Sequence, residues 1–299
     1  MKRVALVIVL VVIAGLAGIV RSHSRVHACI TNLPGVFSDN SGQARDEIRK
    51  SYELAAGARV ELTDINGAIK IETSDTGTAD VYIERTAASP EALNRRKISI
   101  EANSNNLRIH GEKGDVGFFA RLFGSNPTER VTLRLPRQIS LAAKDVNGSL
   151  TSGELDGSVE VHGVNGQVQI AGAAGTVDFK GINGNILVGL KRLNSEGVSI
   201  HGVNGNIELQ LSEGLNADLD AHGMNGRVTS DLPEVTIDKS RHGSYSARIG
   251  SGGSAISAHG INGNIRLTRA TANSPDTAAD VSSKEQTTQS SWFYNNNLF

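Results

Sequence analysis

The chain has few of the residues that cross-link or fill an ordinary globular core. It has 299 residues and a single cysteine, Cys29, so no intramolecular disulfide can form. Aromatic residues make up only 4% of the chain, and between Ser140 and Ala270 the only two are Phe179 and Tyr245. A core in that region must therefore consist of Val, Ile, Leu and Ala, which suits a narrow, flat-sided interior.

The chain also has no excess of charge of one sign and no known catalytic motif. The formal net charge of -1 gives no basic excess, so we expect no nucleic-acid partner. The sequence contains no H-E-x-x-H, G-x-S-x-G, Walker loop or C-x-x-C, and Gly250–Gly253 precedes no helical pattern. The carboxylates show no non-repeating cluster; between positions 145 and 213 they are Asp145, Glu154, Asp156, Glu160, Asp178, Glu196, Glu208 and Glu213. We therefore predict no catalytic residue, no cofactor and no metal site.

The N-terminus carries the clearest targeting signal. Lys2 and Arg3 precede a run from Val4 to Val20 that contains no charged residue. Such a run is long for a signal-peptide core and just long enough for a membrane-spanning helix. Val26-His27-Ala28 permits cleavage before Cys29, although Arg21 and Arg25 intervene, and Cys29 also allows a lipoprotein interpretation. Residues 1–28 are thus predicted to be a signal peptide or a membrane anchor, and either would export the rest of the chain.

A repeat dominates the second half of the chain. Six Asn-Gly pairs, each behind an aliphatic residue or Met, begin at Asn147, Asn165, Asn183, Asn204, Asn225 and Asn262. Their spacings are 18, 18, 21, 21 and 37 residues, the last close to two periods. A fixed period near 20 indicates one supersecondary unit stacked on copies of itself, which is typical of a solenoid. Half-repeats at Leu155–Val161 and Ala174–Phe179 indicate two strand-and-turn units in each coil.

Strand patterns also precede this array. Val60 and Leu62, then Ile65-Asn66-Gly67, then Ile69 and Ile71 predict a strand, an Asn-Gly turn and a second strand. Further alternating runs lie at Val81–Ile83, Ile98–Ile100, Leu107–Ile109 and Val131–Leu135, and residues 91–97 fit a short helical turn. The predicted organisation is a signal or anchor (1–28), a spacer (29–52), an N-terminal β region (53–137), solenoid repeats (138–269) and a disordered tail (270–299). The Phe-rich stretch Phe118–Phe123 is a lid over the open end of the stack, a local core cluster, or an apolar loop that contacts a membrane or a partner.

The repeated Asn and aliphatic positions have distinct expected roles. Asn-Gly allows the positive φ that a tight corner requires, and stacking would bring the Asn amides into register about 4.8 Å apart, close enough to bond to one another. Exposed ligand contacts are the alternative role for these Asn residues. The positions expected to point inward are Val146, Val164, Val168, Ile170, Ile182, Ile186, Val188, Val203, Ile207, Leu209, Met224, Ile261, Ile265 and Leu267.

Another position repeats three residues before each Asn and carries Lys or His. Its members are Lys144, His162, Lys180, His201, His222 and His259, and His242 holds the same place within the longest gap. Counting His242 gives one coil per step and seven consecutive coils. Side chains in this row should face outward and gain positive charge in mild acid, although neighbouring charges would oppose full protonation. Three interpretations remain open: a turn preference with solvated side chains, a site for anions, or a metal site.

With these repeats laid out, the chain resembles the bacterial putative adhesin domain family of uncharacterised extracytoplasmic β-helical proteins. The matching features are Val131–Leu135 followed by Pro136, the repeated Val/Ile-Asn-Gly-x-Val/Ile units, and Gly250–Gly253 before Ile261-Asn262-Gly263. The resemblance spans residues 51–268. It implies a right-handed parallel β-solenoid behind a signal or anchor, with no assigned activity and no functional residues to carry over.

The sequence thus predicts an all-β protein: a solenoid of about 18–21 residues per coil that acts as a non-enzymatic, adhesin-like binding or scaffolding module of the cell envelope. Its expected partners are a membrane, through the N-terminal segment, and an envelope polymer or protein. Two alternatives remain open. A polysaccharide-active β-helix enzyme would need carboxylates, or a carboxylate with Lys or Arg, that converge in one groove. An envelope-stress sensor would be favoured by neighbouring regulatory genes and by an uncleaved anchor.

Overall fold

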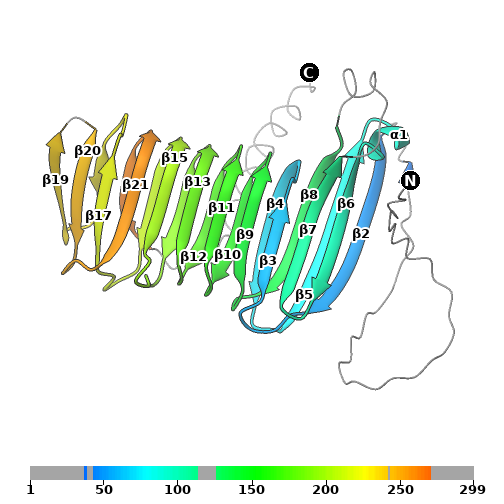
Figure 1. Cartoon of the computed structure of the whole chain (residues 1–299), viewed down its shortest axis with the longest axis horizontal. Helices are drawn as coiled ribbons and strands as arrows, with labels where there is room; N and C mark the ends of the chain where they lie inside the picture. Colours follow the sequence, from blue (N-terminus) through cyan, green and yellow to red (C-terminus); the bar gives the residue numbers. More distant parts are fainter. Residues whose placement is uncertain (1–36, 39–42, 114–125, 242, 271–299) are drawn as a thin grey trace, which may run out of the picture.

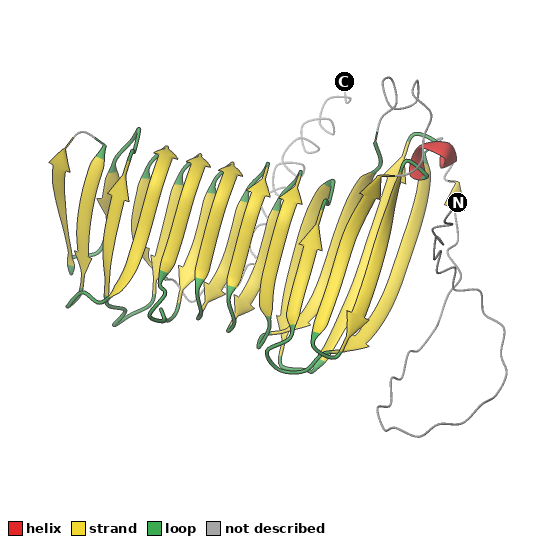
Figure 2. Ribbon diagram, in the orientation of Figure 1, coloured by secondary structure: helices red, strands yellow, loops and turns green. Residues whose placement is uncertain are grey.

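The computed structural model describes residues 37–38, 43–113, 126–241 and 243–270. These ranges form two sheets of 11 strands each, which run along the long axis of the molecule (Figure 1, Figure 2). The only helix among them is α1 (Pro90–Leu93), whose N-terminus Ser89 caps by accepting a hydrogen bond from the Ala92 N–H at 3.2 Å. The all-β prediction is therefore confirmed.

The two sheets are named here by their strands, each given in spatial order. Sheet A contains β1 (Phe37–Ser38), β2 (Ala44–Glu53), β5 (Thr78–Ala87), β8 (Thr128–Pro136), β4 (Gly67–Ser74), β10 (Leu150–Leu155), β12 (Val168–Ala173), β14 (Ile186–Leu190), β16 (Ile207–Leu211), β22 (Ile265–Arg269) and β18 (Val228–Ser230). Sheet B contains β19 (Val235–Arg241), β20 (Ser244–Ile249), β17 (Ala217–His222), β21 (Ser254–Asn262), β15 (Val198–Asn204), β13 (Val177–Asn183), β11 (Val159–Val164), β9 (Ser140–Val146), β3 (Arg59–Thr63), β7 (Asn106–Lys113) and β6 (Arg96–Asn103).

In the middle of the molecule, each sequence repeat supplies one strand to each sheet. β9, β11, β13 and β15 pair in parallel in sheet B, while β10, β12, β14 and β16 pair in parallel in sheet A. The register follows the sequence period, since Val159 lies opposite Leu141 on one side and Val177 on the other. Repeat, strand pairing and register therefore agree.

The core is a continuous row of aliphatic side chains between the two sheets. Every position that the sequence predicted to point inward is buried, and the most exposed of them is Met224 at 6%. Phe179 is the largest of the fully buried side chains. Burial of branched side chains from both sheets is the main favourable term in such a structure, at about 25 cal/mol for each Å² of apolar surface.

The Asn-Gly pairs lie where the chain passes from one sheet to the other. Their glycines come within van der Waals distance of the preceding coil: a Cβ added to Gly184, whose φ is 157°, would lie 2.2 Å from the Gly166 carbonyl oxygen. The positive φ that we expected at these pairs belongs to the Gly in every pair except Asn225-Gly226. The pair at Asn66 is also such a corner, between β3 of sheet B and β4 of sheet A, and it does not close a two-stranded hairpin.

The expectation of one coil per step fails at the C-terminal end. β19 and β20, which lie in the interval between His222 and His259, form an antiparallel hairpin, and β20 pairs antiparallel with β17. β21 then returns to lie between β15 and β17, and β22 lies between β16 and β18. The last sequence repeat is therefore inserted between two earlier ones, because antiparallel pairing of the hairpin with β17 leaves the slot beside β15 for the returning strand.

A similar insertion occurs at the other end. β3 pairs in parallel with both β7 and β9, and β4 pairs in parallel with both β8 and β10. The first Asn-Gly coil thus lies between two segments that follow it in the sequence. Beyond it, antiparallel pairs β6–β7, β5–β8 and β2–β5 extend the sheets toward the N-terminal end.

Near each end of the Asn-Gly array, one buried side chain bonds to the backbone of the last Asn-Gly corner. At the N-terminal end, the fully buried Glu129 accepts hydrogen bonds from Arg96 Nε at 3.0 Å and from the Asn66 N–H at 2.8 Å. At the C-terminal end, Tyr245 of β20 donates its hydroxyl proton to the Gly226 carbonyl at 3.0 Å. Both contacts satisfy backbone groups of the outermost Asn-Gly corners.

Several predictions fall on parts of the chain that the structure does not describe. These are the signal or anchor in residues 1–28, the Phe118–Phe123 stretch, His242 and the tail beyond Ala270. In the described ranges, no helix combines the length and hydrophobicity that a membrane crossing needs.

Candidate binding faces

An unbroken ladder of asparagine amides runs along one corner of the molecule. Each Nδ2 donates to the Oδ1 of the neighbouring coil, at 2.9 to 3.1 Å, in the order Asn225, Asn262, Asn204, Asn183, Asn165, Asn147 and Asn66. Asn66 in turn donates to the Pro127 carbonyl at 2.7 Å. Since each of these amides is engaged along the ladder, the arrangement favours a structural role for them over ligand contact.

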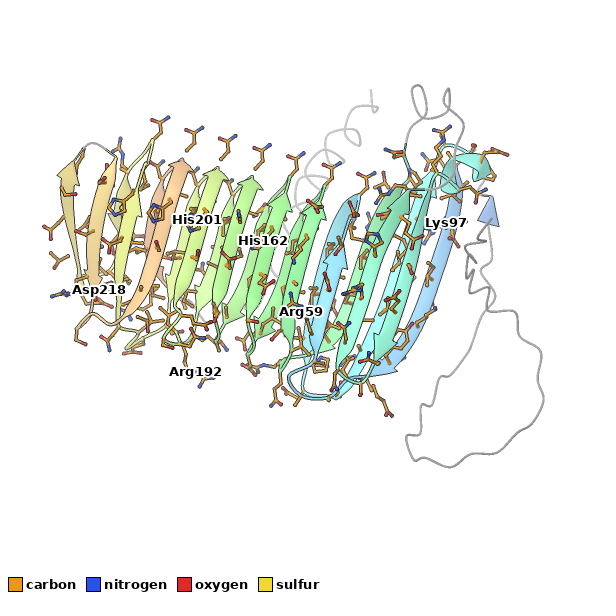
Figure 3. All side chains as sticks on the ribbon, viewed as in Figure 1. Arg59, Lys97, His162, Arg192, His201 and Asp218 are labelled. Atoms are coloured by element: carbon orange, nitrogen blue, oxygen red, sulfur yellow. The ribbon has the colours of Figure 1, made fainter. Side chains whose placement is uncertain are left out.

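The predicted Lys and His positions lie on the outer face of sheet B, one on each strand. Neighbouring strands place them opposite one another in the order Lys144, His162, Lys180, His201, His259 and His222, which we call the Lys/His column. Figure 3 shows two of its members, His162 and His201, on one face. His242 lies outside the described residues. The insertion of β21 places His259 between His201 and His222, an order that differs from the sequence.

Three imidazoles of this column touch one another. The ring centroids of His201 and His259 are 5.1 Å apart in a stacked arrangement, and those of His222 and His259 are 5.4 Å apart. His222 Nδ1 also lies 3.4 Å from the Ser244 hydroxyl. The three rings are thus ordered by the strand register, and each added positive charge there would repel its neighbour.

Carboxylates flank the column on the same outer face. Two positions before its members, the strands carry Glu160, Asp178 and Asp220, with Ser199 and Ser257 between the last two. Asp178 Oδ2 lies 2.8 Å from His162 Nε2, and Glu160 pairs with Arg59 at 2.9 Å. These carboxylates offset the positive charge of the column, on which the binding of an anion would depend. The anion-binding hypothesis for the column stays a prediction, and these carboxylates weaken it.

Sequence reasoning missed two members of the same register. Thr63 lies opposite both Lys144 and His110, so the column continues onto β3 and β7. Thr63 lies three residues before Asn66, and this spacing could have identified it. His110-Gly111 repeats the His-Gly pair of the four histidine members without a following Asn-Gly, and this dipeptide was the available signal.

The outer face of sheet A holds a groove that the sequence analysis did not identify. It has a volume of about 640 Å³ and extends over β12, β14, β16, β22 and β18. Its walls and floor are formed by Gln167, Asn185, Ile186, Leu187, Asn206, Ile207, Glu208, Arg227, Thr229, Asn264 and Arg266. Half of its eight polar side chains are amides. The repeated triplet Asn-Gly-Asn at residues 183–185, 204–206 and 262–264 was the signal that could have identified them.

Backbone contacts fix the asparagines of this groove. Asn185 Oδ1 accepts from the Asn206 N–H at 2.9 Å, Asn206 Oδ1 accepts from the Asn264 N–H at 3.0 Å, and Asn264 Oδ1 accepts from the Arg227 N–H at 3.1 Å. This second row of asparagines therefore has its oxygens turned toward the protein. The Nδ2 groups of Asn185 and Asn206 donate to no described residue, so both can donate to a ligand.

Charged groups of the groove cluster at its C-terminal end. The only carboxylate in its lining is Glu208, whose Oε1 accepts from the Thr268 hydroxyl at 3.2 Å and from Gln210 Nε2 at 3.3 Å. Arg266 pairs with Asp231 at 2.5 Å, and this contact raises the pKa of the guanidinium. The groove thus offers one carboxylate and two arginines, without a second carboxylate for paired acid–base chemistry.

No metal site follows from the described residues either, because no three of their His, Cys, Asp or Glu side chains come together around a common point.

Comparisons with known proteins return no matching family model and no matching curated protein. Solved structures do match. They include a putative cell adhesion protein from Clostridium sporogenes, with 14% identity over 75% of this chain and 99% of that chain at a TM-score of 0.39. A putative adhesin from Bacteroides fragilis has 13% identity over 74% of this chain and 96% of that chain at a TM-score of 0.30. A putative adhesin from Parabacteroides distasonis has 11% identity over the same shares at a TM-score of 0.30. Their names, one cell adhesion protein and two adhesins, match the name of the family that the sequence resembles.

Proposed function

We propose that this protein is an exported, non-enzymatic binding or scaffolding module of the cell envelope, similar in role to an adhesin. Residues 1–28 direct it out of the cytoplasm and either hold it at a membrane or are removed. The two sheets then present long outer faces to an envelope polymer or a protein partner. No nucleic acid, metal or cofactor enters this proposal.

The body of the module is, in this proposal, a right-handed parallel β-solenoid with short additions at both ends. Parallel pairing of successive strands in both sheets supports this, because a chain that returns to the same sheet beside its previous strand makes a crossover, and such crossovers are nearly always right-handed. A stack of coils in which each repeat contacts only its neighbours is the usual form of extended binding proteins.

The observation that carries the proposal is the unbroken Asn ladder, whose six amide–amide bonds connect seven coils. It aligns the coils in register, so every outward position forms a straight row along the molecule. Rows of equivalent side chains are suited to an extended polymer or a flat surface. A catalytic site requires the opposite, a unique cluster at one place.

An enzyme acting on polysaccharides remains the second candidate, and the groove on sheet A favours it over other enzyme classes. Glu208 and Arg266 lie opposite each other on β16 and β22, so a carboxylate and a guanidinium do meet in one groove. Release of reducing sugar ends or unsaturated products from a soluble polysaccharide, abolished by Glu208→Gln, would support this candidate over the binding module.

Binding to isolated envelope material tests the proposal. Purified full-length chain, in mild detergent, is mixed with washed envelope fragments from the cells that produce it, and the fragments are collected by centrifugation. The proposal predicts saturable co-sedimentation that survives protease treatment of the fragments for a polymer target and is lost for a protein target. A chain that stays in the supernatant at every fragment concentration would contradict the proposal.

A further inference from the structure

The outer face of sheet A has an uncharged tract next to its groove. Two rows of outward positions cross β10, β12 and β14 there: Ser149, Gln167 and Asn185 in one, Thr151, Gln169 and Leu187 in the other. Charged residues make up 20% of the chain, yet none occupies these six positions. On the opposite face, the outward positions of β11 and β13 in sheet B carry Glu160, Asp178, His162 and Lys180. The absence of charge is therefore specific to the face of sheet A.

The groove continues this tract toward the C-terminal end. Four uncharged side chains of its lining, Gln167, Asn185, Asn206 and Asn264, follow one another at strand spacing along a single row. Leu187 lies beside them, half-buried, and supplies an apolar spot at the floor. Amide donors beside an apolar floor fit a ligand with many hydroxyl groups and apolar ring faces, and the volume of about 640 Å³ lies within the usual range of binding sites.

Charge balance limits the class of ligand. At the C-terminal end, Glu208 and Arg266 lie opposite each other on the adjacent strands β16 and β22. Arg266 forms an ion pair with Asp231, so the charge of Arg227 offsets that of Glu208. The groove as a whole is close to neutral. An anionic polymer would therefore lose hydration on binding without gaining enough opposite charge, whereas an uncharged polymer pays no such cost.

From these features we infer that the groove and the uncharged tract together form a binding site for an extended, uncharged polysaccharide, with the chain laid across the strands of sheet A. The Nδ2 groups of Asn185 and Asn206 donate to sugar hydroxyls, because their oxygens are already fixed by the backbone of the next strand. Leu187 contacts a ring face. This inference rests on the proposed function and names the ligand class and the face that the module uses.

The test compares polymers and faces. Full-length chain in mild detergent is run in native gels that contain dextran, galactomannan, xyloglucan or hydroxyethyl cellulose, and in gels that contain the acidic polymer polygalacturonate. Retardation by at least one uncharged polymer is expected, with none by polygalacturonate. Retardation by polygalacturonate alone, or by no polymer in the panel, would overturn the inference.

Two double variants locate the site. Gln167→Glu/Gln169→Glu adds two charges to the tract without a change in shape, and at least tenfold weaker binding to the retarding polymer is expected. The control, Lys97→Gln/Glu101→Gln, changes two exposed side chains on β6, the edge strand of sheet B outside the Lys/His column, and should leave that binding within twofold of the unaltered chain. Equal effects of the two variants, or no effect of the first, would overturn the inference.

The same two variants separate this inference from the proposed function. If Gln167→Glu/Gln169→Glu still co-sediments with envelope fragments as tightly as the unaltered chain, the envelope module stands and the groove is not its contact. If neither the unaltered chain nor the control co-sediments, the proposed function itself has failed. Thermal melting of both variants should match the unaltered chain, since exposed substitutions of this kind change stability by about 0.5 kcal/mol or less.

Discussion

At the scale of single residues, the asparagine ladder stabilises the stack through bonds between exposed amides. Asn183, in the interior of the ladder, both donates to Asn165 at 3.0 Å and accepts from Asn204 at 3.1 Å. Asn225, at its end, only donates, to Asn262 at 3.0 Å. Interior and terminal members therefore differ by one hydrogen bond of the ladder.

Replacing these two residues by Ala tests the ladder. A typical intramolecular hydrogen bond contributes about 1 kcal/mol, so we expect Asn183→Ala to lower the free energy of unfolding by about 2 kcal/mol and Asn225→Ala by about 1 kcal/mol. Urea denaturation followed by circular dichroism measures both. Equal losses, or none in either variant, would show that the ladder amides are merely solvated.

Asp218 of β17 fixes the glycine-rich turn before β21. Its carboxylate accepts from the Gly253 N–H at 3.0 Å and from Arg248 Nε at 3.1 Å. The Gly253 N–H, and then Arg248, lower the pKa of this carboxyl below its ordinary value. A carboxyl whose pKa is lower in the folded than in the unfolded chain stabilises the fold above the unfolded pKa, and this contribution is lost as the pH falls through the folded pKa.

Asp218→Asn should therefore lower the melting temperature at neutral pH, and the difference from the unaltered chain should shrink as the pH falls below about 4. Asp220→Asn is the matched control, because Asp220 lies two residues along the same strand and accepts no hydrogen bond from the described residues. Melting curves between pH 2.5 and pH 7 give both profiles. A difference for Asp218→Asn that stays constant over this range would contradict the assignment.

At the scale of elements, the N-terminal end depends on a buried ion pair between β6 and β8. The Glu129 side chain is fully buried and that of Arg96 is 12% exposed, with Nε and Oε1 at 3.0 Å. Arg96 also donates to the Asp64 carbonyl, so one guanidinium bridges two strands and a corner. Removal of one partner would leave a buried charge without compensation.

We expect Arg96→Met to lower the free energy of unfolding by about 3–5 kcal/mol. The double variant Arg96→Met/Glu129→Gln removes the uncompensated charge and keeps an acceptor for the Asn66 N–H, so it should be more stable than the single variant. Chemical denaturation of the two compares them directly. A double variant that is less stable than Arg96→Met would contradict a dominant role for the buried charge.

The sequence was sufficient to predict the local content of each coil, because the period brings an inward aliphatic side chain and an Asn-Gly corner to the same place each time. Val164 and Ile182 could be assigned inward, and Asn165 and Asn183 to a ladder, from spacing alone. It was not sufficient for the order of the coils. Ile261-Asn262-Gly263 matches every other repeat, and no local pattern specifies that β21 pairs with β15 rather than lying beyond β17. The groove was missed because it forms only where neighbouring strands bring Asn185, Asn206 and Asn264 side by side, and the sequence does not specify that pairing.

At the scale of the whole molecule, the insertion of the last coil has a mechanical consequence. β17 pairs with β21 and β20 but not with β15, so in the described structure the C-terminal hairpin is joined to the remaining stack through β21 and β22. Stability in such stacks is close to a sum of contacts between neighbours, so loss of one inner coil disconnects everything beyond it.

A chain that ends at Gly253 should therefore lose amide protection over residues 217–249 as well, while residues 140–211 stay protected. A chain that ends at Ala270 is the control and should retain protection in both ranges. Hydrogen exchange with mass spectrometry resolves the two regions. Retained protection over residues 217–249 in the shorter chain would show that β17 docks on β15 without the inserted coil. The inserted coil would then not be what joins the C-terminal hairpin to the stack.

In the proposed function, this stack works outside the cytoplasm as a part of the cell envelope. The most direct test is fractionation of the cells that produce it, with N-terminal sequencing of the mature chain. We predict recovery in the envelope or outside the cell, with either an intact N-terminus, as an anchor or an envelope sensor requires, or a new one near Cys29. A soluble cytoplasmic product that begins at Met1 would contradict the claim.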